Sequence, residues 1–160
     1  MRIPPVVMPL VAAVSLYAIP ALSADTPTHT FTNPADVKWE PAPPNLPKGA
    51  KVAVLYGDPS KPGPYVMRLM TPANYKIPPH WHPGAENLTV ISGTFYLGFG
   101  EKVEPAKAQA LKAGGFHQVP PKTPHFAFTK GPVVIQAHGE GPFATTYVNE
   151  ADDPSKATKK

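Results

Sequence analysis

Four side chains with metal-binding chemistry lie at regular spacings in the middle of the sequence. His80 and His82 are two residues apart, and in an extended strand such residues point to the same side, so their imidazoles aim at one point. Pro83-Gly84 then turns the chain, and Glu86 opens the next apolar run, where its carboxylate can return to that point. A third imidazole is available downstream at His125.

Three imidazoles and one carboxylate form a ligand set suited to a divalent transition metal, and Fe, Mn, Ni, Cu and Zn all accept such donors. In an octahedral arrangement, four protein ligands leave two positions for water or substrate. That arrangement indicates an open, catalytic type of site and not a closed structural zinc site. We therefore expect one metal ion on His80, His82, Glu86 and His125. The alternative interpretation is that these are hydrogen-bonded histidines and an exposed glutamate.

These residues resemble the first conserved motif of the cupin superfamily, G-x5-H-x-H-x3-E-x6-G. The positions that match are His80, His82, Glu86 and Gly93. Asn74 stands where the family usually has its first glycine. This departure is mild, because Asn is the residue that best tolerates a left-handed backbone after Gly.

The second cupin motif, G-x5-P-x-G-x2-H-x3-N, is matched less completely. Gly114, Pro120 and His125 match, whereas Lys122 replaces the inner glycine and Thr129 replaces the final asparagine. The motif's one ligand, His125, is present. The resemblance covers roughly residues 50 to 148.

The resemblance implies a cupin-type jelly-roll β-barrel with one mononuclear metal site. Similar cupins include dioxygenases, decarboxylases, isomerases and lyases that act on small organic molecules, with the metal as Lewis acid or redox centre. Other cupins are non-catalytic sensors, storage proteins or envelope accessory proteins, so the fold alone does not choose between an enzyme and a binding module. Cupins also often pair as dimers through edge strands, and a homodimer is expected on that ground.

A second polar group close to the metal would favour catalysis, and His138 is the candidate. It ends an apolar run just before Gly139, where its imidazole could act as a general acid or base. The alternative is a core or rim histidine that is hydrogen-bonded to the backbone. Further side chains that could reach the pocket are Tyr96, Tyr147 and Arg68, although each has an ordinary packing or solvent-facing interpretation.

The elements that must position these residues are short β-strands. Apolar and β-branched runs separated by Gly and Pro turns predict nine to eleven strands, which without the resemblance indicates a sandwich or barrel. Ser92-Gly93 lies between two such runs and predicts a two-residue hairpin. If Glu86 faces inward, alternation places Leu88 and Val90 on the same side, giving an apolar pocket wall. A short helix competes only within residues 102–112.

Composition narrows the class of protein further. The chain has 160 residues with 42% hydrophobic content, enough for one domain with a core, and no cysteine, so the fold is expected to depend on its core and its metal. The net charge of +4 comes from scattered lysines, and no basic patch with interleaved aromatics occurs. A nucleic-acid partner is therefore not expected. The expected partner is a small molecule.

The first 24 residues have the pattern of a secretory signal peptide. Arg2 precedes an apolar stretch from Val6 to Leu22, and small residues follow at the expected cleavage site. The stretch is short and contains Pro20, which disfavours a stable membrane anchor. We expect an exported protein, periplasmic or secreted. The expected organisation is a signal peptide at 1–24, a flexible or extended arm at 25–48, the barrel at 49–149 and a polar tail at 150–160.

Overall fold

The computed structural model describes residues 30–156, and regular structure in this range is nearly all β. The strands are β1 (Glu40–Pro41), β2 (Lys51–Tyr56), β3 (Gly63–Thr71), β4 (Lys76–Trp81), β5 (Glu86–Ser92), β6 (Thr94–Phe99), β7 (Gln109–Lys112), β8 (Phe116–Val119), β9 (His125–Thr129), β10 (Val133–Gly141) and β11 (Thr146–Tyr147). Short 3-10 helices lie at η1 (Pro34–Asp36), η2 (Pro105–Lys107) and η3 (Glu150–Asp152). The predicted signal peptide, residues 1–24, lies outside the described range.

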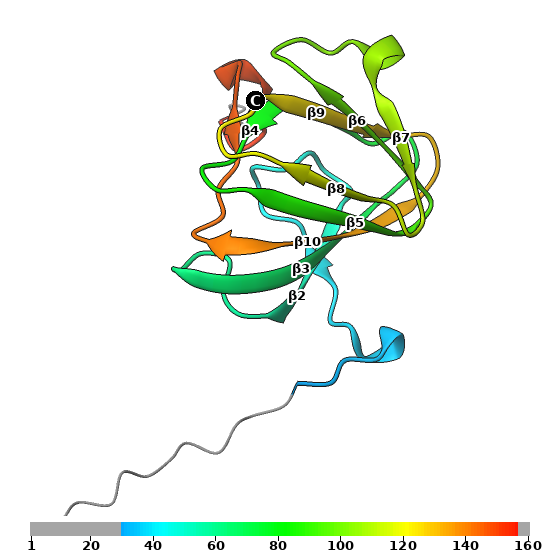
Figure 1. Cartoon of the computed structure of the whole chain (residues 1–160), viewed down its shortest axis with the longest axis vertical. Helices are drawn as coiled ribbons and strands as arrows, with labels where there is room; N and C mark the ends of the chain where they lie inside the picture. The colour runs from blue at the N-terminus through cyan, green and yellow to red at the C-terminus, as the bar shows by residue number, and fades with distance from the viewer. Residues whose placement is uncertain (1–29, 157–160) are drawn as a thin grey trace, which may run out of the picture.

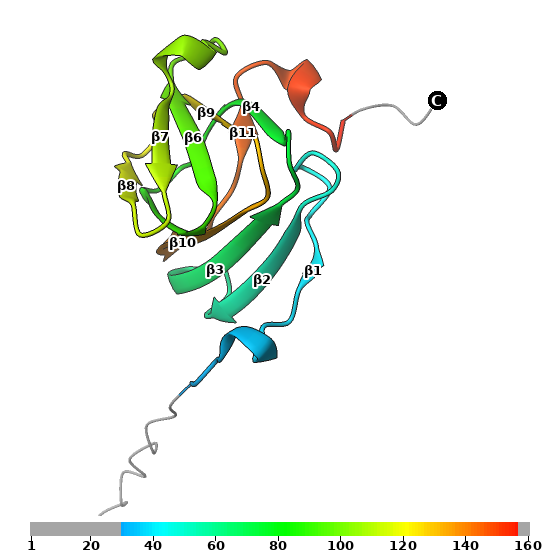
Figure 2. The same ribbon diagram turned by 90° about the vertical axis from the view of Figure 1, so that its right-hand side faces the viewer.

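The strands form two antiparallel sheets that face one another. One has six strands in the order β1-β2-β3-β10-β5-β8, and the other has five in the order β11-β4-β9-β6-β7. Figure 1 shows β2, β3, β10, β5 and β8 as one layer and β9, β6 and β7 as the other, and Figure 2 shows the same two layers from the side. The prediction of an all-β fold is confirmed, and the two antiparallel sheets agree with the expected cupin-type architecture.

The core lies between the two sheets and follows strand alternation. In the six-stranded sheet, every second residue of β5 and β10 is buried, including Leu88, Val90 and Ile135. In the five-stranded sheet, Phe95 and Leu97 of β6 are buried in the same way. The inward direction predicted for Leu88 and Val90 is what the structure shows, and it follows from Glu86 being buried on the same strand face.

The hairpin predicted at Ser92-Gly93 is wrong. The turn is present, with Gly93 at a positive φ of 81°, but β5 and β6 belong to different sheets and do not pair. A side chain at Gly93 would collide with the backbone oxygen of Pro132. The turn therefore carries the chain from one layer to the other instead of reversing it within a layer, a distinction that local sequence does not encode.

The proline-rich end of the predicted N-terminal arm lies against the barrel. Glu40 and Pro41 pair with Val52 and Lys51, adding β1 to the edge of the six-stranded sheet. In residues 102–112 the competing helix is reduced to the single turn η2, which begins at Pro105, and β7 follows it. No helix within residues 30–156 has the length and apolar character needed to cross a bilayer.

Candidate metal centre

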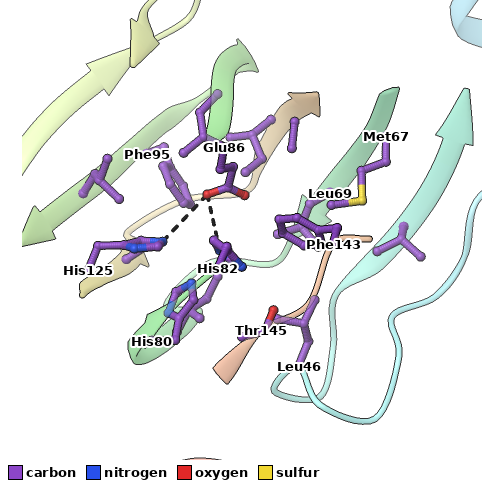
Figure 3. A pocket seen from close by; sticks show the side chains of 17 residues that line it. Leu46, Met67, Leu69, His80, His82, Glu86, Phe95, His125, Phe143 and Thr145 are labelled. Atoms are coloured by element: carbon purple, nitrogen blue, oxygen red, sulfur yellow. Dashed lines mark ion pairs between the residues drawn. The ribbon is translucent and has the colours of Figure 1, made fainter. Parts of the chain in front are cut away.

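The expected metal ligands come from three strands that meet at one end of the barrel. His80 lies near the end of β4, directly opposite His125, the first residue of β9. His82 follows β4, and Glu86 begins β5 in the opposite sheet. Figure 3 shows the three rings and the carboxylate pointing toward a common centre. The structure therefore brings together the four residues that the sequence pattern selected.

A local irregularity in β4 directs His80 inward. Ile77 also faces the interior, yet residues three apart on a regular strand point to opposite sides. The pairing of β4 with β9 shifts register between Ile77 and His80, across Pro78 and Pro79. A bulge of this kind inserts a residue and re-aims the side chains that follow. The two prolines, which cannot donate ladder hydrogen bonds, therefore help to orient the first ligand.

The three rings are close together and almost completely buried. One nitrogen from each of His80, His82 and His125 lies within 4.8 Å of the others. Their exposed fractions are 4%, 4% and 2%. Buried imidazoles packed this tightly without a shared ion would leave polar nitrogens facing one another, which favours a role as ligands.

Backbone hydrogen bonds fix which nitrogen of each ring faces the centre. Nδ1 of His80 donates to the Pro78 carbonyl at 2.7 Å, and Nδ1 of His125 donates to the Thr123 carbonyl at 2.9 Å. Nδ1 of His82 donates to the Ala144 carbonyl at 2.8 Å. A carbonyl oxygen only accepts, so Nδ1 carries the proton in each neutral ring and Nε2 has a free lone pair. This is the tautomer that a metal-ligating histidine requires.

Glu86 completes the donor set. Its Oε2 atom lies 3.5 Å from Nε2 of His82 and 3.7 Å from Nε2 of His125. Donor atoms that each lie about 2.0–2.2 Å from one ion are separated by about 2.8–3.6 Å at angles of about 90–110°. The two observed separations, 3.5 and 3.7 Å, lie at the upper end of this range or just beyond it. The residues present therefore fit a divalent transition metal.

The electrostatics of the rings follow from burial and from the nearby carboxylate. Burial, with the neighbouring His125 and His82, holds the pKa of His80 well below its usual value. Burial also lowers the pKa of His125, although the charge of Glu86 partly opposes it. For His82, burial acts downward but hydrogen bonding to Glu86 and its charge outweigh it, and the pKa is raised. Two of the three rings thus favour the neutral state that binds a metal.

A small apolar cavity of about 60 Å³ opens at the ligands. Its walls come from both sheets, with Leu88, Ile135 and Leu97 among them, and the ring of Phe143 stacks on His82 at 4.4 Å between centroids. Apart from the four expected ligands, the only polar side chain among the described residues that line it is Thr145. The cavity therefore combines one polar end with an apolar body, as small-molecule sites commonly do.

His138 does not join this site. Ile135 and Ala137 of β10 line the metal cavity, and alternation turns His138 to the opposite face of the sheet, where it lies beside Tyr56 and Glu140 in a separate surface hollow. The expected role of His138 as a general acid or base therefore has no support from its position. A strand-end histidine could be placed only by knowing which face of β10 was buried.

The other pocket candidates also lie elsewhere. Arg68 donates from Nε to Gln136 at 3.1 Å on the outer face of the six-stranded sheet. Tyr96 stacks on Phe128, with ring centroids 4.8 Å apart. Tyr147 is buried near His80, but its hydroxyl donates to the backbone oxygen of Asn45 at 2.7 Å. None of the three candidates lines the cavity.

The two departures from the glycine positions of the motifs are structurally conservative. Asn74 has φ 59° and Lys122 has φ 56°, so both keep the left-handed backbone that the family's glycines supply. The amide of Lys122 donates to the carbonyl of His82 at 2.8 Å, which ties the loop before His125 to the turn after His82. The weakened second motif thus retains its turn.

Sequence reasoning missed Leu46, Phe143 and Thr145, which line one side of the cavity. Figure 3 shows them on the side away from His125. They lie in connecting segments outside the two motifs, and no local pattern marks them. Their proximity to the ligands depends on how the segment before β2 and the segment after β10 run past the open end of the barrel.

Comparison with known proteins supports the fold. The family described as "Cupin domain" matches residues 66–136, a range that contains all four expected ligands. Similar solved structures include the polyketide cyclase RemF from Streptomyces resistomycificus, at 17% identity and TM-score 0.67, covering 81% of this chain and 92% of that one. No curated protein sequence matches the chain.

Two further solved structures are similar. An RmlC-like cupin from Shewanella frigidimarina has 17% identity and TM-score 0.55, covering 71% of this chain and 91% of that one. The DMSP lyase DddQ from Ruegeria pomeroyi has 17% identity and TM-score 0.57, covering 71% of this chain and 62% of that one. At this level of identity the similarity shows a shared fold alone.

Proposed function

The chain belongs to the cupin superfamily, and from this premise we propose that it is a metal-dependent enzyme acting on a small organic molecule. The observation that carries the proposal is the convergence of three Nε2 atoms and a carboxylate at the polar end of a small apolar cavity. Each ring is already oriented by a backbone carbonyl, so the site is pre-formed.

His80, His82, Glu86 and His125 would hold the ion. A divalent transition metal bound there supplies Lewis acidity or redox chemistry. The protein's own contribution is to orient the donor rings, to surround a bound molecule with apolar walls and to exclude bulk water from it. Water exclusion strengthens every electrostatic interaction within the cavity.

The cavity also limits what the side chains can do. Beyond the four expected ligands, its described lining includes only Thr145 as a polar group, and that hydroxyl is neutral. Among the described side chains of the cavity, only the carboxylate of Glu86 could therefore accept a proton removed from a bound molecule, because each ring has a protonated Nδ1 and directs its Nε2 to the metal. This arrangement favours reactions that depend mainly on the metal.

The reaction class is left open by the relatives. The polyketide cyclase and the DMSP lyase share this fold but are named for different reactions. The first experiment is therefore broad: metal-free protein is reloaded separately with Fe, Mn, Ni, Cu and Zn, and turnover of a panel of small organic molecules is followed by oxygen uptake and mass spectrometry. We expect turnover with at least one metal, and its loss in the His125→Ala variant.

A second candidate function is a non-catalytic module that binds a metal or a small ligand. The observation in its favour is that, among the described residues, no acid or base beyond the expected ligands lines the cavity, with His138 on the opposite face of its sheet. Tight binding of a metal without turnover of any compound under any of the five metals would support this candidate and contradict the first.

Export to the periplasm or the exterior is part of the proposal. It is supported by the apolar stretch from Val6 to Leu22, with small residues after it, in the part of the chain outside the described residues. Expression of the full chain in a bacterial host, followed by fractionation and mass spectrometry of its N-terminus, tests this. Recovery outside the cytoplasm with residues 1–23 or 1–24 removed is expected, and a cytoplasmic protein of full length would contradict it.

We also propose a homodimer that forms through an edge strand, with β8 as the edge. Within residues 30–156 this strand ends the six-stranded sheet, so one of its sides has no neighbouring strand there, and Phe116 at its start is 57% exposed. Light scattering coupled to gel filtration is expected to give twice the chain mass, and Phe116→Lys is expected to shift it to the monomer. A monomer at all concentrations would contradict the dimer.

A further inference from the structure

The proline-rich segment before β2 is held against the barrel by two buried tyrosines. The hydroxyl of Tyr147 donates to the carbonyl of Asn45 at 2.7 Å, and the hydroxyl of Tyr75 donates to the carbonyl of Pro47 at 2.6 Å. Both rings are at most 5% exposed. Leu46 is the residue between the two anchored carbonyls, so its position is fixed from both sides.

Leu46 lies between two cavities. It lines the metal cavity of about 60 Å³, and it also lines an outer cavity of about 470 Å³ bounded by the proline-rich segment and the loop at Pro59. The residues common to both cavities are Leu46, Val52, Met67, Phe143 and Thr145. Figure 3 shows Leu46, Met67, Phe143 and Thr145 on the side of the metal cavity away from His125. The two spaces are therefore neighbours across this group of side chains.

The metal end of the inner cavity and the outer cavity differ in charge. At the inner end, a divalent ion held by three neutral imidazoles and one carboxylate has a net charge of +1, which favours an anionic oxygen donor. Among the described residues, the outer cavity is lined by Glu40 and Asp58 and by no lysine, arginine or histidine. Asp58 is already paired with Lys61 at 2.9 Å, which offsets its charge. The carboxylate of Glu40 is therefore the group that disfavours a second anionic group in the outer cavity.

We propose that the two cavities together bind one elongated molecule, a monocarboxylate with an uncharged apolar tail. Its carboxylate lies at the metal end, and its tail passes Leu46 into the outer cavity, so that Leu46 sets how long and how wide a tail is accepted. This inference rests on the proposed metal site. The inner cavity is the smaller of the two, at about 60 Å³ against about 470 Å³ for the outer one.

The test uses the Co(II)-loaded protein and measures binding, not turnover. Butanoate, hexanoate and octanoate are titrated by calorimetry, and the visible spectrum of Co(II) reports whether the carboxylate reaches the metal. We expect the affinity to rise by up to about fourfold for each added methylene, the value for its transfer from water to an apolar site. Octanedioate, with a second carboxylate near Glu40 and Asp58, is expected to bind at least about tenfold more weakly than octanoate.

Two substitutions at Leu46 test whether the apolar tail passes this residue into the outer cavity. Leu46→Trp is expected to weaken octanoate binding much more than butanoate binding, so that the gain in affinity with chain length is lost, and Leu46→Ala is expected to weaken octanoate binding several-fold. The matched controls are Val103→Trp and Val103→Ala, because Val103 is an exposed apolar residue that lines neither cavity. The thermal unfolding transition and the ligand-free Co(II) spectrum of each variant show that it is folded.

The outcomes separate this inference from the proposed function. If butanoate perturbs the Co(II) spectrum but affinity is independent of chain length, or the Leu46 and Val103 variants behave alike, the two-cavity inference is wrong and the metal site stands. If Co(II) binds but no carboxylate perturbs its spectrum, the two-cavity inference is wrong and the metal site stands, whereas both fail if Co(II) does not bind. Equal affinities for octanedioate and octanoate would overturn the charge argument.

Discussion

At the scale of single residues, the sequence identifies the donor atoms better than it identifies their surroundings. The spacing of His80, His82 and Glu86 on extended chain selects residues that the structure places together. What spacing could not indicate is the partner of each Nδ1, because the acceptors are backbone carbonyls. One of them, at Ala144, is 62 residues away from its histidine.

Removal of one ring tests the centre directly. His125→Ala is expected to weaken metal binding on the order of 100-fold, since loss even of a residue that only supports a ligand costs about 10- to 100-fold. Competition against a chelator of known affinity, with the metal content measured after dialysis, provides the readout. The matched control is His117→Ala, a half-buried ring that contacts Phe99 and lies outside the cluster. Equal metal retention in the two variants would contradict the assignment.

Lys122 allows a test of backbone strain. A residue with a Cβ at φ 56° is disfavoured by roughly 1–2 kcal/mol, whereas glycine has no such cost but loses more entropy on folding, by about 0.5–1 kcal/mol. Lys122→Gly is therefore expected to increase the free energy of unfolding by about 0.5–1 kcal/mol. The free energies come from urea denaturation.

The same substitution at Lys76, an exposed residue within β4, is the control for Lys122→Gly. Glycine inside a strand is expected to lower stability. If both substitutions destabilise equally, the left-handed backbone at residue 122 carries no strain.

At the scale of elements, the strands themselves were largely predictable, and their pairing was not. Apolar runs bounded by Gly and Pro match β2, β6, β8 and β9 in their bounds. The pairing depends on which sheet each strand joins, and a turn such as Ser92-Gly93 is compatible with either a hairpin or a crossing. For the same reason His138 was placed near the metal, because the buried face of β10 is set by its neighbours β3 and β5.

Packing between β6 and β9 leads to a prediction about Gly98. Its cross-strand partner is Phe126, whose ring is 1% exposed and occupies the place of a side chain at Gly98. Gly98→Ala would force a methyl group into that ring, and we expect a loss of about 1–3 kcal/mol of unfolding free energy. The control is Gly131→Ala, where no atom lies within 4 Å of the added carbon.

A double-mutant cycle shows whether Phe126 is the cause. In the Phe126→Ala background the obstruction is absent, so Gly98→Ala is expected to be neutral or slightly stabilising. Urea midpoints of the four proteins give the coupling energy. An equal cost of Gly98→Ala in both backgrounds would locate the effect elsewhere.

At the scale of the whole molecule, the centre joins the two sheets. Glu86 comes from the six-stranded sheet, and His80 and His125 come from the five-stranded sheet. An ion shared by them would cross-link the layers in a chain that has no cysteine. The all-β fold and the cluster of three histidines were predictable at this scale. The cavity wall at Leu46 was not, because Leu46 is held there through the hydroxyls of Tyr75 and Tyr147.

Metal removal is therefore expected to lower thermal stability. At a free metal concentration 100 times the dissociation constant, binding to the folded state alone adds about 2.7 kcal/mol, which for a domain of this size raises the melting temperature by on the order of 10 °C. Differential scanning calorimetry with and without chelator measures the shift. The His125→Ala variant is expected to show little or no shift, and a chelator effect of equal size in that variant would indicate a site elsewhere.

The position of β10 has a consequence for the order in which the protein can assemble. This strand is inserted between β3 and β5, so the centre of the larger sheet stays incomplete until residues 133–141 have been synthesised. Before then, β3 and β5 each present a row of unpaired amides and carbonyls to the solvent. Because β10 pairs with a strand about 70 residues earlier, a long loop must close before most of the stabilising contacts can form. Proteins dominated by such non-local pairings fold in milliseconds to seconds. A nascent chain truncated before Val133 should thus be a substrate for chaperones rather than a folded intermediate.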